Sequence, residues 1–314
     1  MTRRIGVDIG GTNLRAALVE PDGSIHDVHR QKNDDHSVEG LARAVAAAIA
    51  ELDGADGDVS VGVGIAGSVR AAEGVVVNAP QLGWTEAPFG AALENALGRP
   101  VRLVNDLSAI CYGEARVGAG HGARDVACLA VGTGVGLGVV ADGRVLEGAA
   151  GLASEFGHVR IDFAPGARRC NCGLEGCIEA YLAGVHLPAR LRETAEETGL
   201  HSELLDDRSL TATEIEAAAV AGDPLARALW DDCARRLAWA MGSVLMTFNP
   251  AVLVLGGGVL NASPSLVADA RVLLPEYAWP SFLENAAVRP SDLGDDAGIV
   301  GAALLADEKR PRNR

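Results

Sequence analysis

Aromatic side chains, basic residues and uncharged apolar runs are all scarce in this sequence of 314 residues. Phe, Trp and Tyr make up 4% of it, whereas Gly occurs 39 times, so glycine-rich turns are expected to matter. Lys and Arg total 27 against 42 Asp and Glu, which gives a net charge of −15. Because an acidic surface repels nucleic-acid phosphates and anionic lipids, we expect neither nucleic acid nor a membrane as a partner.

No apolar run free of charge is long enough to indicate a membrane span. The most apolar helical segment, residues 224–248, contains two aspartates and three arginines and is expected to be an amphipathic or buried helix. The N-terminal stretch MTRRIGVDIGG does not resemble a signal peptide, because Asp8 and glycines interrupt it. The expected compartment is the cytoplasm, where clustered cysteines favour a metal or redox site over a structural disulfide.

A meander of strands and tight turns occurs twice. The first copy has predicted strands at 4–10 and 14–20, and the second has predicted strands at 125–132 and 135–141. Both copies place Gly-Thr at the first turn and Asp-Gly at the second, which indicates an internal duplication.

Helices and strands alternate through much of the chain. Helices are predicted at 38–54, 89–100, 107–118 and 297–307, strands at 59–67, 101–106 and 251–258, and a mainly helical block at 179–248. This alternation predicts an α/β fold with two lobes and a central cleft, in which ligands bind at the carboxyl ends of strands. We expect a smaller lobe of residues 1–118, onto which 298–314 pack back, and a larger lobe of residues 119–297.

Three glycine-rich turns are candidates for binding a nucleotide. Turns of this kind let backbone N–H groups approach an anion, and Asp8 before the first turn could hold Mg²⁺ through water. Each turn alone could be only a tight turn, but the duplication favours phosphate binding for the first two, and the third could pack under an adenosine. The sequence contains no GxxxxGK[ST] motif and no GxGxxG at the first strand. The candidate residues are Gly10, Gly11, Thr12 and Asn13; Gly132, Thr133 and Gly134; and Gly256, Gly257 and Gly258.

Asp106 is the candidate general base. It ends the predicted strand 101–106, where a carboxylate could take the proton of a sugar hydroxyl that attacks a γ-phosphate, with Asn105 holding a neighbouring hydroxyl. The alternative is that Asp106 only caps the helix that follows. Carboxylates such as Glu155 and Glu179 can accept hydrogen bonds from sugar hydroxyls, although Glu155 and His158 could equally lie on a surface helix.

Three of the six cysteines lie close together, as Cys170, Cys172 and Cys177, twelve residues or more after His158. Three thiolates and an imidazole form a normal tetrahedral Zn²⁺ set, which would be structural because it leaves no open position. A disulfide within C-x-C would be strained and would leave an odd cysteine, and a redox pair is more often C-x-x-C, so zinc is favoured over both. The other three cysteines lie in apolar contexts and are expected to be small buried residues.

These motifs together resemble the ROK family of sugar kinases and sugar-responsive repressors. They are DIGGTNLR (8–15), VND (104–106), GTGVG (132–136), SEFGH (154–158), CNCGLEGCIEAY (170–181) and LGGG (255–258), and they cover nearly the whole chain. The resemblance implies the actin-like ATPase (ribonuclease H-like) fold, ATP and Mg²⁺ at the phosphate loops, and structural Zn²⁺ on His158 and the three clustered cysteines. It also implies Asp106 as the catalytic base. The sugar ligands it implies are Asn105, Glu155, His158 and Glu179, and we add Gly67 and Asn78 as weaker candidates.

The expected activity is therefore ATP-dependent phosphorylation of a hexose, with glucose first. N-acetylglucosamine, N-acetylmannosamine, fructose, mannose and allose are alternative substrates, and polyphosphate is an alternative donor. NDLSAI (105–110) and PQLGW (80–84) depart from the family pattern, which leaves the sugar open. A non-catalytic sugar sensor is less expected, because the phosphate strand begins by residue 4 and leaves no room for an N-terminal helix-turn-helix domain. The family expectation for assembly is a homodimer, with a tetramer as the alternative.

Overall fold

The computed structural model describes residues 3–52, 59–207 and 209–308, which fall into two compact units. Unit 1 comprises Met1–Val126, Gly138–Ser154 and Ser291–Arg314, and unit 2 comprises Ala127–Leu137 and Glu155–Pro290. The chain therefore passes from one unit to the other four times. The expected lobe boundaries at residues 118 and 297 stay a prediction, and residues 309–314 of the expected C-terminal segment lie outside the described residues.

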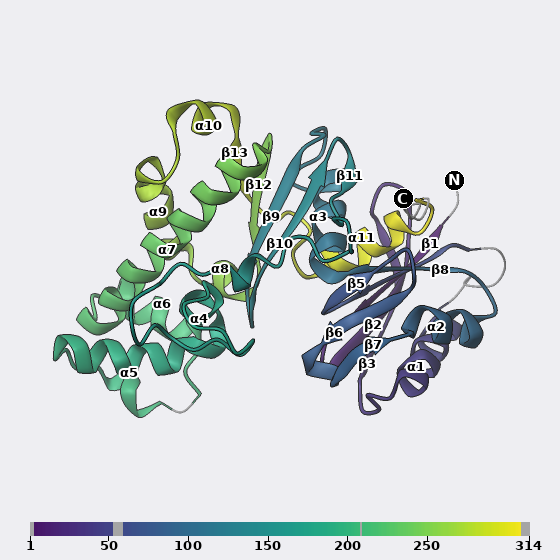
Figure 1. The fold of residues 1–314 in the computed structure, drawn as a ribbon, viewed down its shortest axis with the longest axis horizontal. Coiled ribbons are helices and arrows are strands. Elements are labelled where there is room, and N and C mark those ends of the chain that lie inside the picture. The colour runs from purple at the N-terminus through teal and green to yellow at the C-terminus, as the bar shows by residue number, and fades with distance from the viewer. Residues whose placement is uncertain (1–2, 53–58, 208, 309–314) are drawn as a thin grey trace. The chain divides into compact units, whose positions relative to one another are not determined.

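A five-stranded sheet is the centre of unit 1 (Figure 1). Its strands, in spatial order, are β3 (Ile25–Lys32), β2 (Asn13–Val19), β1 (Arg4–Ile9), β4 (Val61–Ile65) and β8 (Val101–Asn105). The first three form the predicted antiparallel meander, whereas β1, β4 and β8 run parallel. Ile9 pairs with Ile65, and Ile65 pairs with Asn105, so the carboxyl ends of the parallel strands meet at one edge. Ligand sites in open α/β sheets lie at such an edge.

The two faces of this sheet are covered by different helices. The side chains of Ile5, Val7 and Ile9 point into the main core with the helices α1 (Val38–Ala50) and α2 (Phe89–Leu97). The opposite face has glycines at Gly6 and Gly62, where any side chain would collide with the backbone of the helix α11 (Ala297–Leu305). The helix α11 packs on β1 and also on the helix α3 (Asp106–Val117). Alternation along β1 therefore produces one face for side chains and one face for a closely seated helix.

A small antiparallel sheet in unit 1 was not predicted. It consists of β5 (Ser68–Arg70), β6 (Val75–Ala79) and β7 (Trp84–Ala87), with a short 3₁₀ turn, Pro80–Leu82, between the last two strands. Asn78, a candidate sugar ligand, lies in β6 and pairs with Ser68. Trp84 packs in the core, since it is 6% exposed and its ring centroid lies 4.9 Å from that of Phe89.

The second sheet repeats the strand order of the first. Its strands are β11 (Arg144–Val145), β10 (Val135–Ala141), β9 (Val126–Val131), β12 (Val252–Gly256) and β13 (Ala287–Pro290), in that spatial order. The third strand of the second meander is shortened to two residues, β11. In both sheets the three meander strands lie in the spatial order third, second, first, and two strands from later in the chain continue the sheet beside the first. This shared order supports the internal duplication predicted from the sequence.

The helices of unit 2 gather around α7, the long helix in Figure 1. Asp223 caps its start by accepting hydrogen bonds from two backbone N–H groups, and Pro224 occupies its first position. The helix α7 contacts α4, α5, α6, α9 and α10. None of the described helices is both long and apolar enough to cross a membrane. The helices are α4 (Glu179–Leu182), α5 (Leu187–Thr198), α6 (Ala212–Val220), α7 (Pro224–Phe248), α8 (Gly258–Ala262), α9 (Pro264–Leu273) and α10 (Pro280–Asn285).

Candidate functional site

The carboxyl ends of β4 and β8 bring together four of the predicted sugar-site residues. The side-chain amide of Asn105 donates to the carbonyl of Gly67 and to Oδ1 of Asp106, each at 2.9 Å. Gly67 has φ +140°, and a Cβ there would lie 2.5 Å from the carbonyl oxygen of Asn78. Only glycine allows this backbone conformation and this approach. The exposed Asn78 of β6 is therefore carried to the same edge as Asn105 and Asp106.

Asp106 does not cap the helix α3. The cap is Asn105, whose side-chain oxygen accepts a hydrogen bond from the Ser108 N–H at 3.0 Å. Asp106 is the first residue of the helix, and its Oδ1 accepts from the N–H of Leu107 at 2.8 Å. The alternative that Asp106 is present for capping is therefore wrong, and its carboxylate lies beside the cap in a half-buried position.

The first glycine turn lies at this same sheet edge, between β1 and β2. The N–H of Gly10 donates to the carbonyl of Asn13 at 2.9 Å and closes the turn, on which Thr12 and Asn13 are exposed. Asp8, just before the turn, forms an ion pair with Arg15 at 2.6 Å. Since this guanidinium already compensates much of its charge, Asp8 suits an outer ligand that contacts Mg²⁺ through water better than a direct ligand.

The second and third glycine turns lie side by side in unit 2. A Cβ on Gly132 would lie 3.5 Å from the backbone nitrogen of Gly258, and Gly257, at φ +92°, lies directly against the carbonyl of Val131. The turn at Gly132 is closed by its N–H, which donates to the carbonyl of Gly134 at 2.9 Å. Thr133 is exposed on this turn, and Gly256 ends β12. Two of the three predicted nucleotide turns are thus brought together.

Glu179 joins the second glycine turn to the cysteine cluster. Its Oε2 accepts a hydrogen bond from the N–H of Val135 at 3.1 Å, and its Oε1 lies 3.6 Å from Sγ of Cys170. A Cβ on Gly134 would lie 2.7 Å from the carboxylate, so the glycine makes room for Glu179. Glu155 is exposed, and its carbonyl accepts from the N–H of His158. The predicted Glu155, His158 and Glu179 are therefore within one region of unit 2.

His158, Cys170, Cys172 and Cys177 form the predicted four-ligand group. Their ligand atoms all lie within 4.8 Å of one another. Nδ1 of His158 lies 3.6 Å from Sγ of Cys170, and Sγ of Cys172 lies 3.7 Å from that of Cys177. Zinc bonds of about 2.3 Å to sulfur and about 2.0 Å to nitrogen imply tetrahedron edges of about 3.5–3.8 Å. The donor set therefore fits Zn²⁺, and it leaves Nε2 of His158 outside the set.

The thiols of this group form no disulfide with one another. All six cysteines are free, and the expectation that Cys111, Cys128 and Cys233 are buried is confirmed. Burial raises the pKa of Cys170 to about 12 and also raises the pKa of Cys177. A buried thiol of this kind forms a thiolate at neutral pH only with a cation beside it.

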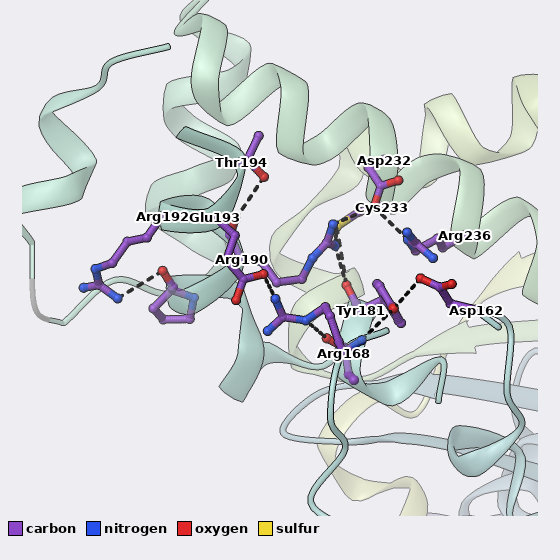
Figure 2. A network of polar contacts seen from close by, with 12 residues as sticks. Asp162, Arg168, Tyr181, Arg190, Arg192, Glu193, Thr194, Asp232, Cys233 and Arg236 are labelled. Atoms are coloured by element: carbon purple, nitrogen blue, oxygen red, sulfur yellow. Dashed lines mark hydrogen bonds and ion pairs between the residues drawn. The ribbon is translucent and has the colours of Figure 1, made fainter. Parts of the chain in front are cut away.

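Tyr181 ties the cysteine loop to α4 without help from a metal (Figure 2). Its hydroxyl donates to Asp162 at 2.6 Å and accepts from the backbone N–H of Arg168 at 3.1 Å. Asp162 and Arg168 lie within the loop that connects His158 to Cys170, and Tyr181 follows Glu179 by two residues. The two ends of the loop are therefore held to the helix that begins with Glu179.

Asp232 of α7 fixes α4 and α5 from the other side (Figure 2). Its Oδ2 accepts from Arg190 at 2.5 Å and from Arg236 at 2.7 Å. Arg190 also donates to the carbonyl of Tyr181 at 2.6 Å, and the guanidinium carbon of Arg236 lies 3.8 Å from the centre of the Tyr181 ring. Tyr181, Arg190 and Asp232 were not predicted from the sequence, because most of their partners lie far along the chain.

Asn33 was also not predicted from the sequence. It directly follows β3 and contacts the first glycine turn through its side chain and its backbone. A signal was available, because the end of the third strand of an antiparallel meander lies beside the start of the second strand.

Known proteins are similar to this chain over nearly its whole length. A family model described as the ROK family matches residues 4–309. The glucokinase of Thermotoga maritima is 34% identical over 312 residues, which cover 97% of each chain. A ROK family glucokinase from Streptomyces griseus, solved with glucose and AMPPNP, superposes with a TM-score of 0.80 at 31% identity and covers 98% of this chain and 100% of that one.

The family also contains regulators. A ROK family transcriptional regulator, a homologue of the Escherichia coli MLC protein, superposes with a TM-score of 0.84 at 26% identity, covering 97% of this chain and 77% of the regulator. These similarities confirm the predicted α/β class and the actin-like ATPase fold with two lobes. The chain belongs to the ROK family.

Proposed function

We propose that this chain is an ATP-dependent hexose kinase that phosphorylates glucose at its 6-hydroxyl, that is, a glucokinase. The observation that carries the proposal is the half-buried carboxylate of Asp106, which lies beside Asn105 at the carboxyl end of β8 while Asn105 caps the helix. The glucokinases of Thermotoga maritima and Streptomyces griseus, similar to this chain over nearly its full length, support the same activity.

Asp106 is the proposed general base. Its carboxylate accepts the proton of the sugar hydroxyl as the hydroxyl oxygen attacks the γ-phosphorus of ATP. The new O–P bond forms while the bond from the γ-phosphorus to the β–γ bridging oxygen breaks, so ADP leaves with that electron pair. Asn105 holds the base, because its amide donates to Oδ1 of Asp106 at 2.9 Å. Mg²⁺, when bound near Asp8, would neutralise the developing phosphate charge.

The sugar ligands are proposed to be Asn105, Glu155, His158 and Glu179. Carboxylates accept strong hydrogen bonds from vicinal hydroxyls, and Nε2 of His158 lies outside the proposed zinc set. Zn²⁺ on the four-ligand group would fix the loop that ends at Glu179, and it has no catalytic step of its own. Gly67 and Asn78 are proposed to shape the rim of the sugar site.

ATP is the proposed donor, and its phosphates are proposed to bind the turns at Gly10–Asn13 and Gly132–Gly134. The Streptomyces griseus relative holds AMPPNP, which supports a nucleoside triphosphate over polyphosphate. We also propose a cytoplasmic location, which suits both ATP and a zinc-bound set of reduced thiols. The proposed homodimer is supported by large apolar side chains exposed near α9 and α10, Val272 at 78% and Trp279 at 70%.

A sugar panel with ATP and Mg²⁺ tests the proposal. We expect ADP release with glucose well above a no-sugar blank, and product that glucose-6-phosphate dehydrogenase can oxidise. The panel includes N-acetylglucosamine, N-acetylmannosamine, fructose, mannose and allose, and a parallel series replaces ATP by polyphosphate. If an N-acetyl sugar supports turnover while glucose matches the blank, glucose is the wrong substrate. If no sugar supports turnover with either donor, the chain is a sensor rather than a kinase.

A further inference from the structure

Asn33 binds the first glycine turn through three hydrogen bonds. Its side-chain Nδ2 donates to the carbonyl of Gly10 at 2.8 Å and to that of Asn13 at 3.2 Å. Its backbone N–H donates to the carbonyl of Thr12 at 2.9 Å. One residue outside the turn therefore engages three of the four carbonyl groups between Gly10 and Asn13.

These bonds decide which way the N–H groups of the turn face. In a planar trans peptide the N–H points away from the carbonyl of the preceding residue. Holding the carbonyl of Gly10 toward Asn33 thus directs the N–H of Gly11 to the opposite side. Within the described parts of the chain, no residue accepts a hydrogen bond from that N–H. The turn is left with its carbonyls on one side and a backbone donor on the other, as an anion-binding turn requires.

Asn33 is a poor choice for stability alone. The residue is 7% exposed, and its Oδ1 is buried without a hydrogen-bond partner among the described residues. Leaving a buried carbonyl oxygen unpaired costs folding free energy. Aspartate of the same shape would place a second oxygen where the amide now donates to two carbonyls. The Asn33 amide thus donates to two carbonyls, although its unpaired oxygen lowers the stability of the fold. This indicates a role beyond packing.

We propose that Asn33 is a positioning residue for the nucleotide, which holds the turn at Gly10–Asn13 so that its backbone donors face the ATP phosphates. The inference rests on the proposed function, because it takes this turn to be a phosphate site. Asn33 lies outside every motif that links the chain to its family, since it follows β3.

The test compares Asn33→Ala and Asn33→Asp with the wild-type chain. For both variants we expect the KM for ATP and the calorimetric Kd for ADP to rise by about tenfold or more, whereas the KM for glucose changes by less than about twofold. The effect of Asn33→Asp should be the larger, because its carboxylate would face two carbonyl oxygens. The matched control is Asn285→Ala, which removes another amide that donates to a backbone carbonyl, at 2.7 Å from Ser281, in unit 2.

The different effects on the KM for ATP and the KM for glucose distinguish a positioning role of Asn33 from a purely structural one. A variant that melts at lower temperature but keeps both KM values, or raises both equally, would overturn the role of Asn33. If Asn33→Ala does not fold, Asn33→Asp, which removes both donors, is decisive, and a normal Kd for ADP in that variant would be equally contrary. If the wild-type protein binds ADP but phosphorylates no sugar, only the proposed function is wrong, and the Kd for ADP still tests the positioning role of Asn33. Wild-type protein that binds no nucleotide would overturn both.

Discussion

Asn105 and Asp106 divide two tasks between adjacent residues. Asn105 caps α3 with its oxygen and holds the Asp106 carboxylate with its amide, so Asp106 is not needed to start the helix. Oδ1 of Asp106 accepts from the Asn105 amide and from the N–H of Leu107, so the order Asn-Asp places a carboxylate beside the cap at the end of β8.

Asp106→Asn should leave glucose affinity nearly unchanged and lower kcat by at least about 10²-fold, because an amide cannot accept the hydroxyl proton. Steady-state kinetics and glucose binding by calorimetry measure the two effects separately. The matched control is Asp223→Asn, which changes an aspartate at the start of α7 in unit 2 and should leave turnover near the wild-type value. Near-normal kcat in the Asp106 variant would remove it as the base.

At the scale of elements, two separate sets of contacts hold the loop between His158 and Cys177. One is the proposed zinc set, and the other is the Tyr181 hydroxyl with its bonds to Asp162 and Arg168. Zinc would hold the part of the loop beside Glu179, whereas the Tyr181 hydroxyl holds the loop to α4, which packs on α7. Removal of zinc should therefore loosen the loop without releasing it from unit 2.

Cys172→Ser should lower the zinc content from about one per chain to well below it, and the KM for glucose should rise with it, because Glu179 is no longer held. Metal analysis by mass spectrometry and a thermal melt give the readouts. Cys111→Ser is the control, since that thiol donates to a backbone carbonyl that a hydroxyl can also reach. Full zinc content in the Cys172 variant would contradict the ligand assignment.

Asp232 links α7 to α4 and α5 in a pH-dependent way. Burial alone would raise its pKa, but the hydrogen bond from Arg236 and the charge of Arg190 outweigh this and hold the pKa of Asp232 below its usual range. A depressed folded-state pKa stabilises the fold above the unfolded value of about 3.9, and this contribution is lost as pH falls through the folded value.

Asp232→Asn should therefore lower the free energy of unfolding by roughly 2 kcal/mol near neutral pH, with the deficit constant down to about pH 5 and narrowing below about pH 4. Urea denaturation across this range measures it. Asp142→Asn is the control, because its ion pair with Arg124 is exposed at 80% and 74% and should matter little. A deficit that stayed constant into acid would show that charge is not the cause.

The elements that the sequence predicted well are those whose signals are local. The apolar strands β1, β4 and β8 follow from contiguous residues, and so do the glycine turns and the cysteine cluster. The sheet of β5, β6 and β7 was missed because its strands are only three to five residues long, although they follow one another along the chain. Asn33 and Asp232 were missed for another reason, since each bonds to residues that come near it only after folding.

At the scale of the whole molecule, the net charge of −15 separates the kinase proposal from the regulator that the family also contains. DNA binding depends on the neutralisation of phosphates by Lys and Arg, which this composition opposes. We expect no binding of duplex DNA even at about 50 mM salt, where such contacts are strongest. Fluorescence anisotropy with and without glucose measures this, and saturable binding that glucose reverses would favour a sensor.

The seating of α11 on β1 also bears on how the molecule is made. β1 precedes unit 2 in the chain, yet its glycine face lies against α11, whose residues follow the whole of unit 2. During translation one face of β1, the strand that carries Asp8, therefore stays uncovered by α11 until unit 2 has been synthesised. The strand before the proposed phosphate turn is thus synthesised before unit 2 but is packed on both faces only after unit 2. A nascent chain that ends before residue 297 should expose the glycine face of β1 to chaperones.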